Sequence, residues 1–329
     1  MPAEWETHEA TWLAWPHERT DWPGKFAPIP WVYGDIVQRL SRVEKVRILV
    51  PDTAAEKTAR RVLVKSGANM RAVEFFRHAT NRSWTRDYCP IFARDQRGSI
   101  VITNWIFSGW AKYDNWRDDN KVAGALVKRL KLPQVEPGIV LEGGSIDVNG
   151  RGLLLTTEEC QLSDTVQVRN PGLRRADLER YFADYLGITR TIWLKRGIAG
   201  DDTHGHIDDL ARFVDENTVV IVVEKDKSDA NYEPLRENLA LLRQTGLRVE
   251  MLPMPTPVYF DGQRLPASYA NFYIANGLVL VPTFNDALDR VALAKLADLF
   301  PNREVVGIHC LDLVLGLGTL HCMTMQQPL

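Results

Sequence analysis

The residues most able to do chemistry lie close to the end of the chain, around Cys322. Two glycines, Gly316 and Gly318, lead into the run Thr319-Leu320-His321-Cys322. Glycine lets backbone turn sharply or approach a ligand closely, so Gly318 is a candidate substrate contact and Cys322 a candidate nucleophile. A free cysteine is also a common buried apolar residue, and the local pattern alone leaves that alternative open.

Other chemically capable side chains stand at the starts of predicted strands, each after a turn or a glycine. They are Asp87, Glu142, His206 with Asp208, and Asn271, the last a candidate substrate contact. Each one alone has an ordinary structural explanation, such as a turn carboxylate, a loop glutamate, a satisfied buried histidine or a capping amide. Together with a thiol, the set fits a covalent reaction on a small cationic substrate.

The set suggests a reaction at a guanidine group. The carboxylates of Asp87 and Asp208 can hold a planar guanidinium by paired, charge-assisted hydrogen bonds. Cys322 would attack the central carbon, and His206 would protonate departing ammonia and later activate water. Glu142 would orient the imidazole. The nearby carboxylates are expected to raise the pKa of the Cys322 thiol until the cation binds.

Two further histidines raise alternatives. His321 is expected to be a poor base, because neighbouring residues on a strand face opposite sides. His204, His206 and Asp208 would face the same way on an extended strand and could ligate zinc there. Such a site needs another ligand and supporting partners that the sequence does not clearly supply. A zinc-dependent hydrolase is therefore the less favoured alternative.

The elements that must position these residues repeat along the chain. A polar motif, a strand, a tight turn, a second strand and an amphipathic helix recur at a spacing of roughly 60 residues. The predicted hairpins cover 89–102, 145–155, 210–223 and 272–282, and the helices that follow cover 118–130, 173–186, 233–245 and 287–299. The stretch with Cys322 would be a shortened fifth copy, or would close the first.

The opening of the chain has a β-α-β rhythm. Strands are predicted at 11–15, 46–52 and 73–76, with helices at 31–43 and 54–66. The repetition predicts one closed, pseudo-symmetric α/β domain over residues 1–329, in which every polar motif points at the same centre. Tryptophans are dense near the start and are expected mostly in the core, with Trp15 a weak candidate for a pocket wall.

Composition is that of an ordinary soluble globular protein. The chain has 329 residues, 45% hydrophobic and 25% charged, with a net charge of -2. This balance gives no electrostatic footprint for nucleic acid or an acidic membrane surface. We also find no run near the ~20 apolar residues of a membrane span and no signal-peptide pattern. Four widely spaced cysteines are typical of reduced thiols, which indicates a cytoplasmic enzyme or binding protein.

Several motifs, taken in order, carry a family likeness. They are the opening MPAEWETHEATWLAWP, Trp84-Thr85-Arg86-Asp87, Glu142-Gly143-Gly144-Ser145, Asp201-Asp202-Thr203-His204-Gly205-His206-Ile207-Asp208, Ser268-Tyr269-Ala270-Asn271-Phe272-Tyr273, and His321-Cys322-Met323-Thr324 with Gln326-Gln327-Pro328. They resemble the agmatine deiminase and bacterial-type peptidylarginine deiminase family over nearly the whole chain.

The resemblance implies the pentein fold, an α/β propeller of five ββαβ-type units with pseudo-fivefold symmetry, and no metal or organic cofactor. It implies a thiouronium intermediate on Cys322, His206 as acid and base, and Asp87 with Asp208 holding the guanidinium. In the resemblance, Glu142 matches the acidic residue that supports the histidine, and Trp84 matches a pocket wall.

Two departures from the family pattern concern the substrate. Agmatine-specific members usually read D-T-D-G-H where this chain has Asp202-Thr203-His204-Gly205-His206, and three glycines where it has Gly316-Leu317-Gly318. The resemblance favours conversion of agmatine to N-carbamoylputrescine and ammonia, as in polyamine synthesis. Deimination of peptidyl-arginine or of another guanidino compound stays open, and a homo-oligomer is possible.

Overall fold

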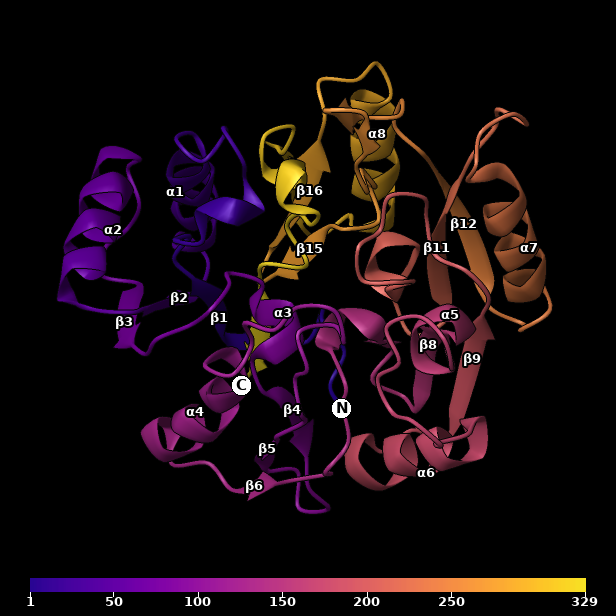
Figure 1. The fold of residues 1–329 in the computed structure, drawn as a ribbon, viewed down its shortest axis with the longest axis horizontal. Coiled ribbons are helices and arrows are strands. Elements are labelled where there is room, and N and C mark those ends of the chain that lie inside the picture. Colours follow the sequence, from indigo (N-terminus) through magenta and orange to yellow (C-terminus); the bar gives the residue numbers. More distant parts are fainter.

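In the computed structural model, which describes residues 1–329, small sheets stand around a common centre with the long helices outside them (Figure 1). The first sheet has the order β18-β1-β2-β3. Its strands are β1 (His8–Ala14), β2 (Lys45–Val50), β3 (Val73–Arg77) and β18 (Met325–Pro328), and the helices α1 (Ile29–Leu40) and α2 (Thr53–Lys65) connect β1 to β2 and β2 to β3.

Four more sheets share one plan, an antiparallel hairpin followed by a helix and a third strand that pairs parallel to the second. The strands are β4 (Ile91–Arg94), β5 (Ile100–Thr103), β6 (Gln134–Val135); β7 (Asp147–Val148), β8 (Leu153–Thr157), β9 (Arg190–Leu194); β10 (Ala211–Phe213), β11 (Thr218–Val223), β12 (Arg248–Pro253); β15 (Tyr273–Ala275), β16 (Leu278–Thr283), β17 (Glu304–His309). The helices are α4 (Val122–Leu130), α6 (Arg175–Leu186), α7 (Tyr232–Arg243) and α8 (Asp289–Leu299).

Short elements fill the space between these units. They are α3 (Thr85–Tyr88), α5 (Glu158–Gln161), the hairpin of β13 (Tyr259–Phe260) and β14 (Gln263–Arg264), and the 3-10 helices η1 (Arg19–Asp21), η2 (Asp119–Lys121), η3 (Gly143–Ser145), η4 (Ile207–Asp209) and η5 (Leu313–Gly316). In Figure 1 α3 lies near the centre of the ring, whereas α4, α6, α7 and α8 lie at its edge.

The middle strands explain why each unit is stable. β11 reads TVVIVV and β16 reads LVLVPT, and all but the last residue of each strand is buried. Runs of β-branched and aliphatic residues suit strands that are covered on both faces. The helices present one apolar side to these sheets, and 80 buried residues form one contiguous core.

The predicted hairpins and helices are confirmed, with boundaries that shift by a few residues. The final strand closes the first sheet, because β18 pairs antiparallel with β1 and places Gln326 opposite Thr11. The prediction was wrong in one respect, because the polar motifs do not enter the hairpins directly. Asp87 lies in α3, Glu142 immediately precedes η3, and Asp208 lies in η4. The third strands β6, β9, β12 and β17 belong to the ββαβ units that the resemblance implies, but the sequence patterns did not place them along the chain.

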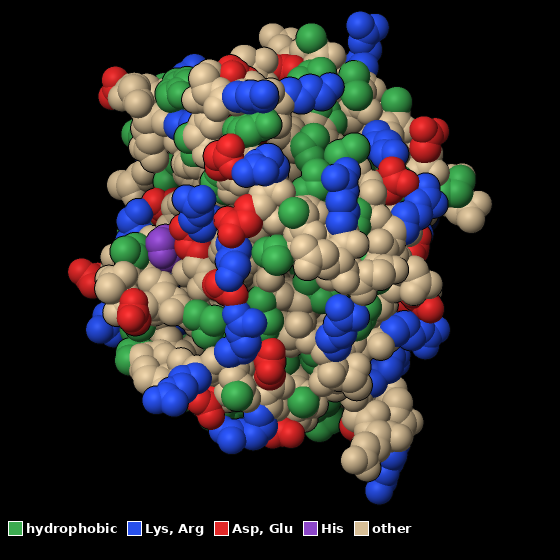
Figure 2. All heavy atoms as spheres, turned by 90° about the vertical axis from the view of Figure 1, so that its right-hand side faces the viewer, with side chains coloured by type: hydrophobic (Ala, Val, Ile, Leu, Met, Phe, Trp, Pro, Cys, Tyr) green, Lys and Arg blue, Asp and Glu red, His purple; other side chains and the backbone are tan.

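The surface agrees with the weak net charge. Figure 2 shows a face on which lysine and arginine side chains are interspersed with aspartate and glutamate, so that no continuous basic area forms there. Such a mixed surface lacks the clustered cations that bind a phosphate backbone. Among the helices, none is both long and apolar enough to cross a bilayer.

Candidate active site

The thiol of Cys322 is held in a turn between η5 and β18. Asn271 fixes this turn, because its Oδ1 accepts hydrogen bonds from the hydroxyl of Thr319 (2.7 Å) and the backbone N–H of His321 (3.0 Å). Its Nδ2 lies 3.1 Å from Cys322 Sγ and donates to Asp209 at 2.9 Å. Asn271 therefore fixes the position of the turn that carries Cys322.

Glycines in the same turn permit close packing. A Cβ on Gly318 would lie 3.0 Å from the Trp84 ring and 3.0 Å from Cys322 Cβ, and one on Gly316 would lie 2.7 Å from Trp22 and Trp84. Contacts this short are tighter than real side chains tolerate, so these glycines let the turn pack on the indole of Trp84.

Two carboxylates flank the thiol. Asp87 accepts hydrogen bonds from Trp110 Nε1 (2.9 Å) and the backbone N–H of Gly144 (3.0 Å). Asp208 Oδ2 lies 3.7 Å from Cys322 Sγ. A Cβ on Gly144 would come within 2.6 Å of His206 Nδ1 and 3.0 Å of Asp208. Glycine at 144 therefore leaves the centre of the site open.

His206 faces both carboxylates. Its Nε2 lies 3.2 Å from Glu142 Oε2, while its Nδ1 lies 3.8 Å from Asp87 Oδ1 and 3.9 Å from Asp208 Oδ1. His206 Nδ1 and Asp208 Oδ1 are buried and have no hydrogen-bond partner. Buried polar atoms are nearly always paired, so these two are candidates for pairing with a polar ligand.

The buried ionisable groups of the site shift one another's pKa values. Burial, followed by the carboxylate of Asp208, raises the pKa of the Cys322 thiol well above its ordinary value. This direction agrees with the expectation from sequence. Burial also raises the pKa of Asp87 to about 6. Burial opposes the charged form of His206, but Asp87 and the partners of the ring raise its pKa well above the ordinary value.

The other two carboxylates shift the opposite way. For Asp208 the cost of burial is outweighed by the hydrogen bond and charge of His321, which lower its pKa. For Glu142 burial is likewise outweighed by Arg169 and His206, and its pKa is lowered. At neutral pH the site therefore combines a thiol, an imidazolium and ionised carboxylates.

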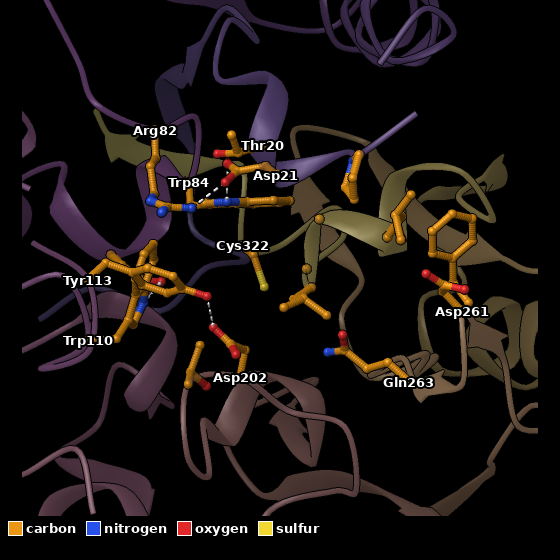
Figure 3. Close-up of a pocket in the computed structure, with 18 residues that line it drawn as sticks. Thr20, Asp21, Arg82, Trp84, Trp110, Tyr113, Asp202, Asp261, Gln263 and Cys322 are labelled. Atoms are coloured by element: carbon orange, nitrogen blue, oxygen red, sulfur yellow. Dashed lines mark hydrogen bonds and ion pairs between the residues drawn. The ribbon is translucent and has the colours of Figure 1, made fainter. Parts of the chain in front are cut away.

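A cavity of about 420 Å³ opens above the thiol. Its lining includes Asp87, Trp84, Gly318 and Cys322. Figure 3 shows Cys322 pointing into this space from one side, with Trp84 over it and Tyr113 and Asp202 joined across the cavity. The Tyr113 hydroxyl donates to Asp202 at 2.7 Å.

Of the predicted catalytic residues, Asp87 and Cys322 line the cavity, whereas Glu142, His206 and Asp208 are buried and do not line it. Trp84 and Gly318 lie on its wall as predicted. Asn271 is buried and contacts Cys322 without lining the cavity. Trp15 lies outside the lining and packs edge-on against Tyr33.

The zinc alternative rested on a strand that does not form. His204 has a left-handed φ of 65° and lies in a turn before η4. Its Nδ1 is 3.9 Å from Glu159, and the residue lines a different surface hollow. His204 therefore does not share a face with His206 and Asp208.

Two side-chain groups have the spacing of metal ligands. Glu142, Cys160 and His206 form one, and Asp208, Asp209 and Cys322 form the other. The first already holds a cation, because Arg169 Nε lies 3.1 and 3.2 Å from the two oxygens of Glu142. The second includes the candidate nucleophile itself.

Sequence reasoning missed several residues of the site. Arg169 donates to Glu142, Trp110 donates to Asp87, and His321 donates to Asp208. His321 does not face the cavity, as expected, but the expected reason was wrong, because the residues before Cys322 form a turn and not a strand. No local signal marks Arg169, whose role depends on a contact between distant segments.

The fold and the site define a guanidine-modifying hydrolase of the pentein class. A family model described as Porphyromonas-type peptidyl-arginine deiminase matches residues 1–328. The chain belongs to this family.

Relatives with known names agree over the whole chain. The agmatine deiminase of Pseudomonas fluorescens is 34% identical, and the match covers 100% of this chain and 95% of that protein. A cysteine-to-serine variant of C. jejuni agmatine deiminase with substrate bound has a TM-score of 0.89 at 31% identity, covering 99% of this chain and 95% of the other. For the agmatine deiminase of Enterococcus faecalis the TM-score is 0.91 at 29% identity, covering 100% and 95%.

Proposed function

We propose that this protein hydrolyses agmatine to N-carbamoylputrescine and ammonia, through a covalent intermediate on Cys322. The observation that carries the proposal is the pair of buried, unpartnered atoms beside the thiol, His206 Nδ1 and Asp208 Oδ1. A guanidinium supplies N–H donors to carboxylate oxygens and places its carbon within reach of a thiol. The relatives called agmatine deiminase support this substrate.

In the first half of the reaction a C–S bond forms and a C–N bond breaks. Asp87 and Asp208 hold the guanidinium, and its positive charge offsets the carboxylates that disfavour the thiolate. As the cation binds, the Cys322 thiol releases its proton to solvent, and the sulfur attacks the guanidinium carbon. His206 Nδ1 delivers a proton to the departing nitrogen, ammonia leaves, and a thiouronium remains on sulfur.

In the second half a C–O bond forms and the C–S bond breaks. Neutral His206 removes a proton from water, and the oxygen attacks the thiouronium carbon. As the C–S bond breaks, the hydroxyl proton of the intermediate passes to the sulfur, and the carbamoyl product leaves with the oxygen. Glu142 accepts from His206 Nε2 throughout, which leaves Nδ1 to carry the proton.

The charges around the cavity favour a cationic tail. Besides Asp87, the lining includes Asp21, Asp202 and Asp261 but only one cation, Arg82. Arg82 already forms an ion pair with Asp21, and Lys112, which lies outside the lining, forms one with Asp202. The carboxylate of free arginine would meet this acidic wall, whereas the amine of agmatine would be attracted to it.

An assay of ammonia release tests the proposal. Agmatine, free arginine and a blocked arginine peptide are compared side by side, with wild type and Cys322→Ala. We expect turnover of agmatine by wild type and none by the variant. Preferential turnover of the peptide would replace agmatine with peptidyl-arginine, and activity that survives Cys322→Ala would reject the covalent mechanism.

Two broader features belong to the same proposal. We propose that residues 1–329 act as one catalytic domain, because a single core of 80 buried residues underlies every unit. A reducing compartment such as the cytoplasm suits the enzyme, because all four cysteines are free thiols.

A further inference from the structure

His321 lies behind Asp208, on the side away from the cavity. Its Nδ1 is 2.8 Å from Asp208 Oδ2, and its Nε2 is 2.8 Å from Glu4 Oε2. The side chain is buried, and neither ring nitrogen faces solvent or the cavity. An ionised carboxylate only accepts hydrogen bonds, so each of these contacts places a ring nitrogen of His321 against an acceptor.

Glu4 is anchored more strongly than its place near the start of the chain suggests. It forms an ion pair with Arg212 Nη2 at 2.9 Å, and it accepts hydrogen bonds from Arg86 Nη2 at 3.2 Å and from the backbone N–H of Ile274 at 2.8 Å. Burial opposes its ionisation, but Arg212, His321 and Arg86 lower the pKa of Glu4 well below its ordinary value. Glu4 is therefore a fixed anion behind His321.

Asp208 depends on this arrangement for its orientation. His321 Nδ1 is the only nitrogen that donates to Asp208, and it binds Oδ2. Oδ1 is thereby left unpartnered and turned toward His206 Nδ1, 3.9 Å away. Asp87, in contrast, is held by two uncharged donors, and its pKa is raised to about 6.

We propose that Glu4 and His321 form a positioning pair, which keeps Asp208 ionised and turns its Oδ1 toward the substrate guanidinium. The inference rests on the proposed function, because the pair would position Asp208, which in that function holds the substrate guanidinium. It also makes the first residues of the chain part of the proposed active site, because Glu4 precedes β1 in the sequence and contacts His321 near the other end of the chain.

The test is the pH dependence of kcat/KM for agmatine in His321→Asn. In wild type the acidic limb should reflect the protonation of one carboxylate, Asp87. Without its charged donor, buried Asp208 should take up a proton in the same range, because burial then dominates. We expect kcat/KM at pH 7 to fall about 100-fold, as a misplaced reacting group commonly causes. The acidic limb should also move up in pH and steepen.

A matched control separates this effect from general damage. His8 is equally buried, and its Nε2 lies 2.7 Å from the backbone oxygen of the same Glu4, yet it does not touch Asp208. His8→Asn should leave the acidic limb in place and change kcat/KM by less than about threefold. A limb that moves equally in His8→Asn and His321→Asn would overturn the inference.

Glu4→Gln provides a second route to the same question. The glutamine carbonyl can still accept from His321 Nε2, but the negative charge is gone, and we expect about a tenfold loss with a limb moved in the same direction. If His321→Asn does not fold, Glu4→Gln decides alone, and an unchanged limb there rejects the pair. Wild type without any deiminase activity would instead reject the proposed function, and the inference with it.

Discussion

At the scale of single residues, the site tunes two similar carboxylates in opposite directions. Asp87 and Asp208 both lie beside His206 and both are buried. Asp87 has neutral donors and a pKa raised to about 6, whereas the contact with His321 lowers the pKa of Asp208. As the pH falls, Asp87 is therefore protonated before Asp208, and the free enzyme is expected to bind a guanidinium more weakly in mildly acidic solution.

This difference leads to a prediction for Trp110→Phe. The change removes the Nε1 donor that bonds Asp87 at 2.9 Å and so removes stabilisation of its ionised form. A carboxyl whose pKa is raised needs a higher pH to ionise, so the acidic limb of kcat/KM, expected near pH 6 in wild type, should move up by about one unit. The pH profile of ammonia release from agmatine measures this shift.

Trp105→Phe is the matched control. Trp105 is also a buried indole that donates a hydrogen bond, but to Thr103 at 2.8 Å, away from the site. Its loss should leave the limb near pH 6. An unmoved limb in Trp110→Phe would mean that Asp87 does not set the acidic side of the profile.

At the scale of elements, sequence patterns predicted the units better than the connections between them. The hairpins and long helices carry strong local signals, such as Asn149-Gly150 at a turn and the apolar run of β11. The short strand β6 is exposed, and most residues of β12 and β17 are exposed or half-buried, so these strands lack the continuous apolar run of β11 and gave a weaker local signal.

The site was predictable in its composition and less so in its contacts. The candidate catalytic residues lie together because each belongs to a polar motif that its unit places at the centre. They are Cys322, His206, Asp208, Asp87 and Glu142. Their supporting partners come from loops that no local pattern connects. Arg169, for example, joins Glu142 to the backbone oxygen of Thr203, a contact between segments far apart in the chain.

The turn before the nucleophile contains a strained residue. Leu317 has a φ of 66°, a left-handed conformation that costs a non-glycine residue about 1–2 kcal/mol, and it lines the cavity. Trp110 and Asp261, which line the same cavity, also have positive φ. Strain of this kind concentrates at functional sites, where the surroundings hold it in place.

We predict that Leu317→Gly changes the free energy of unfolding by less than about 1 kcal/mol, because relief of strain offsets the lost side chain. Leu315→Gly is the comparison, since Leu315 lines the same cavity but lies in η5 and is more deeply buried. Its loss should cost about 3–5 kcal/mol. Urea unfolding of both variants measures the difference, and equal losses would show that Leu317 is not strained. The wider cavity of Leu317→Gly should raise KM for agmatine.

At the scale of the whole molecule, the active site is the meeting point of all the units. Asp87 precedes β4, Glu142 precedes β7, His206 precedes β10, Asn271 precedes β15 and Cys322 precedes β18. Because β18 pairs with β1, the two ends of the chain join in one sheet. The strand β18 of this sheet comes directly after the turn that carries the nucleophile. Opening the ring at that joint should therefore disturb the chemistry and the fold together.

Gln327→Ala tests this coupling. Gln327 Oε1 accepts from Trp12 Nε1 at 2.9 Å and from Arg47 Nη1 at 2.6 Å, so its loss leaves two buried donors unpaired and should cost about 2–4 kcal/mol. In a urea titration we expect the midpoints of activity and of tryptophan fluorescence to fall by the same amount, because no unit holds the site alone. Gln134→Ala, on the exposed strand β6, should move neither midpoint. The opposite result would be a loss of activity at a lower urea concentration than the change in fluorescence. The site would then open locally while β1 and β18 stayed paired, and the positions of the site residues would not depend on that pairing.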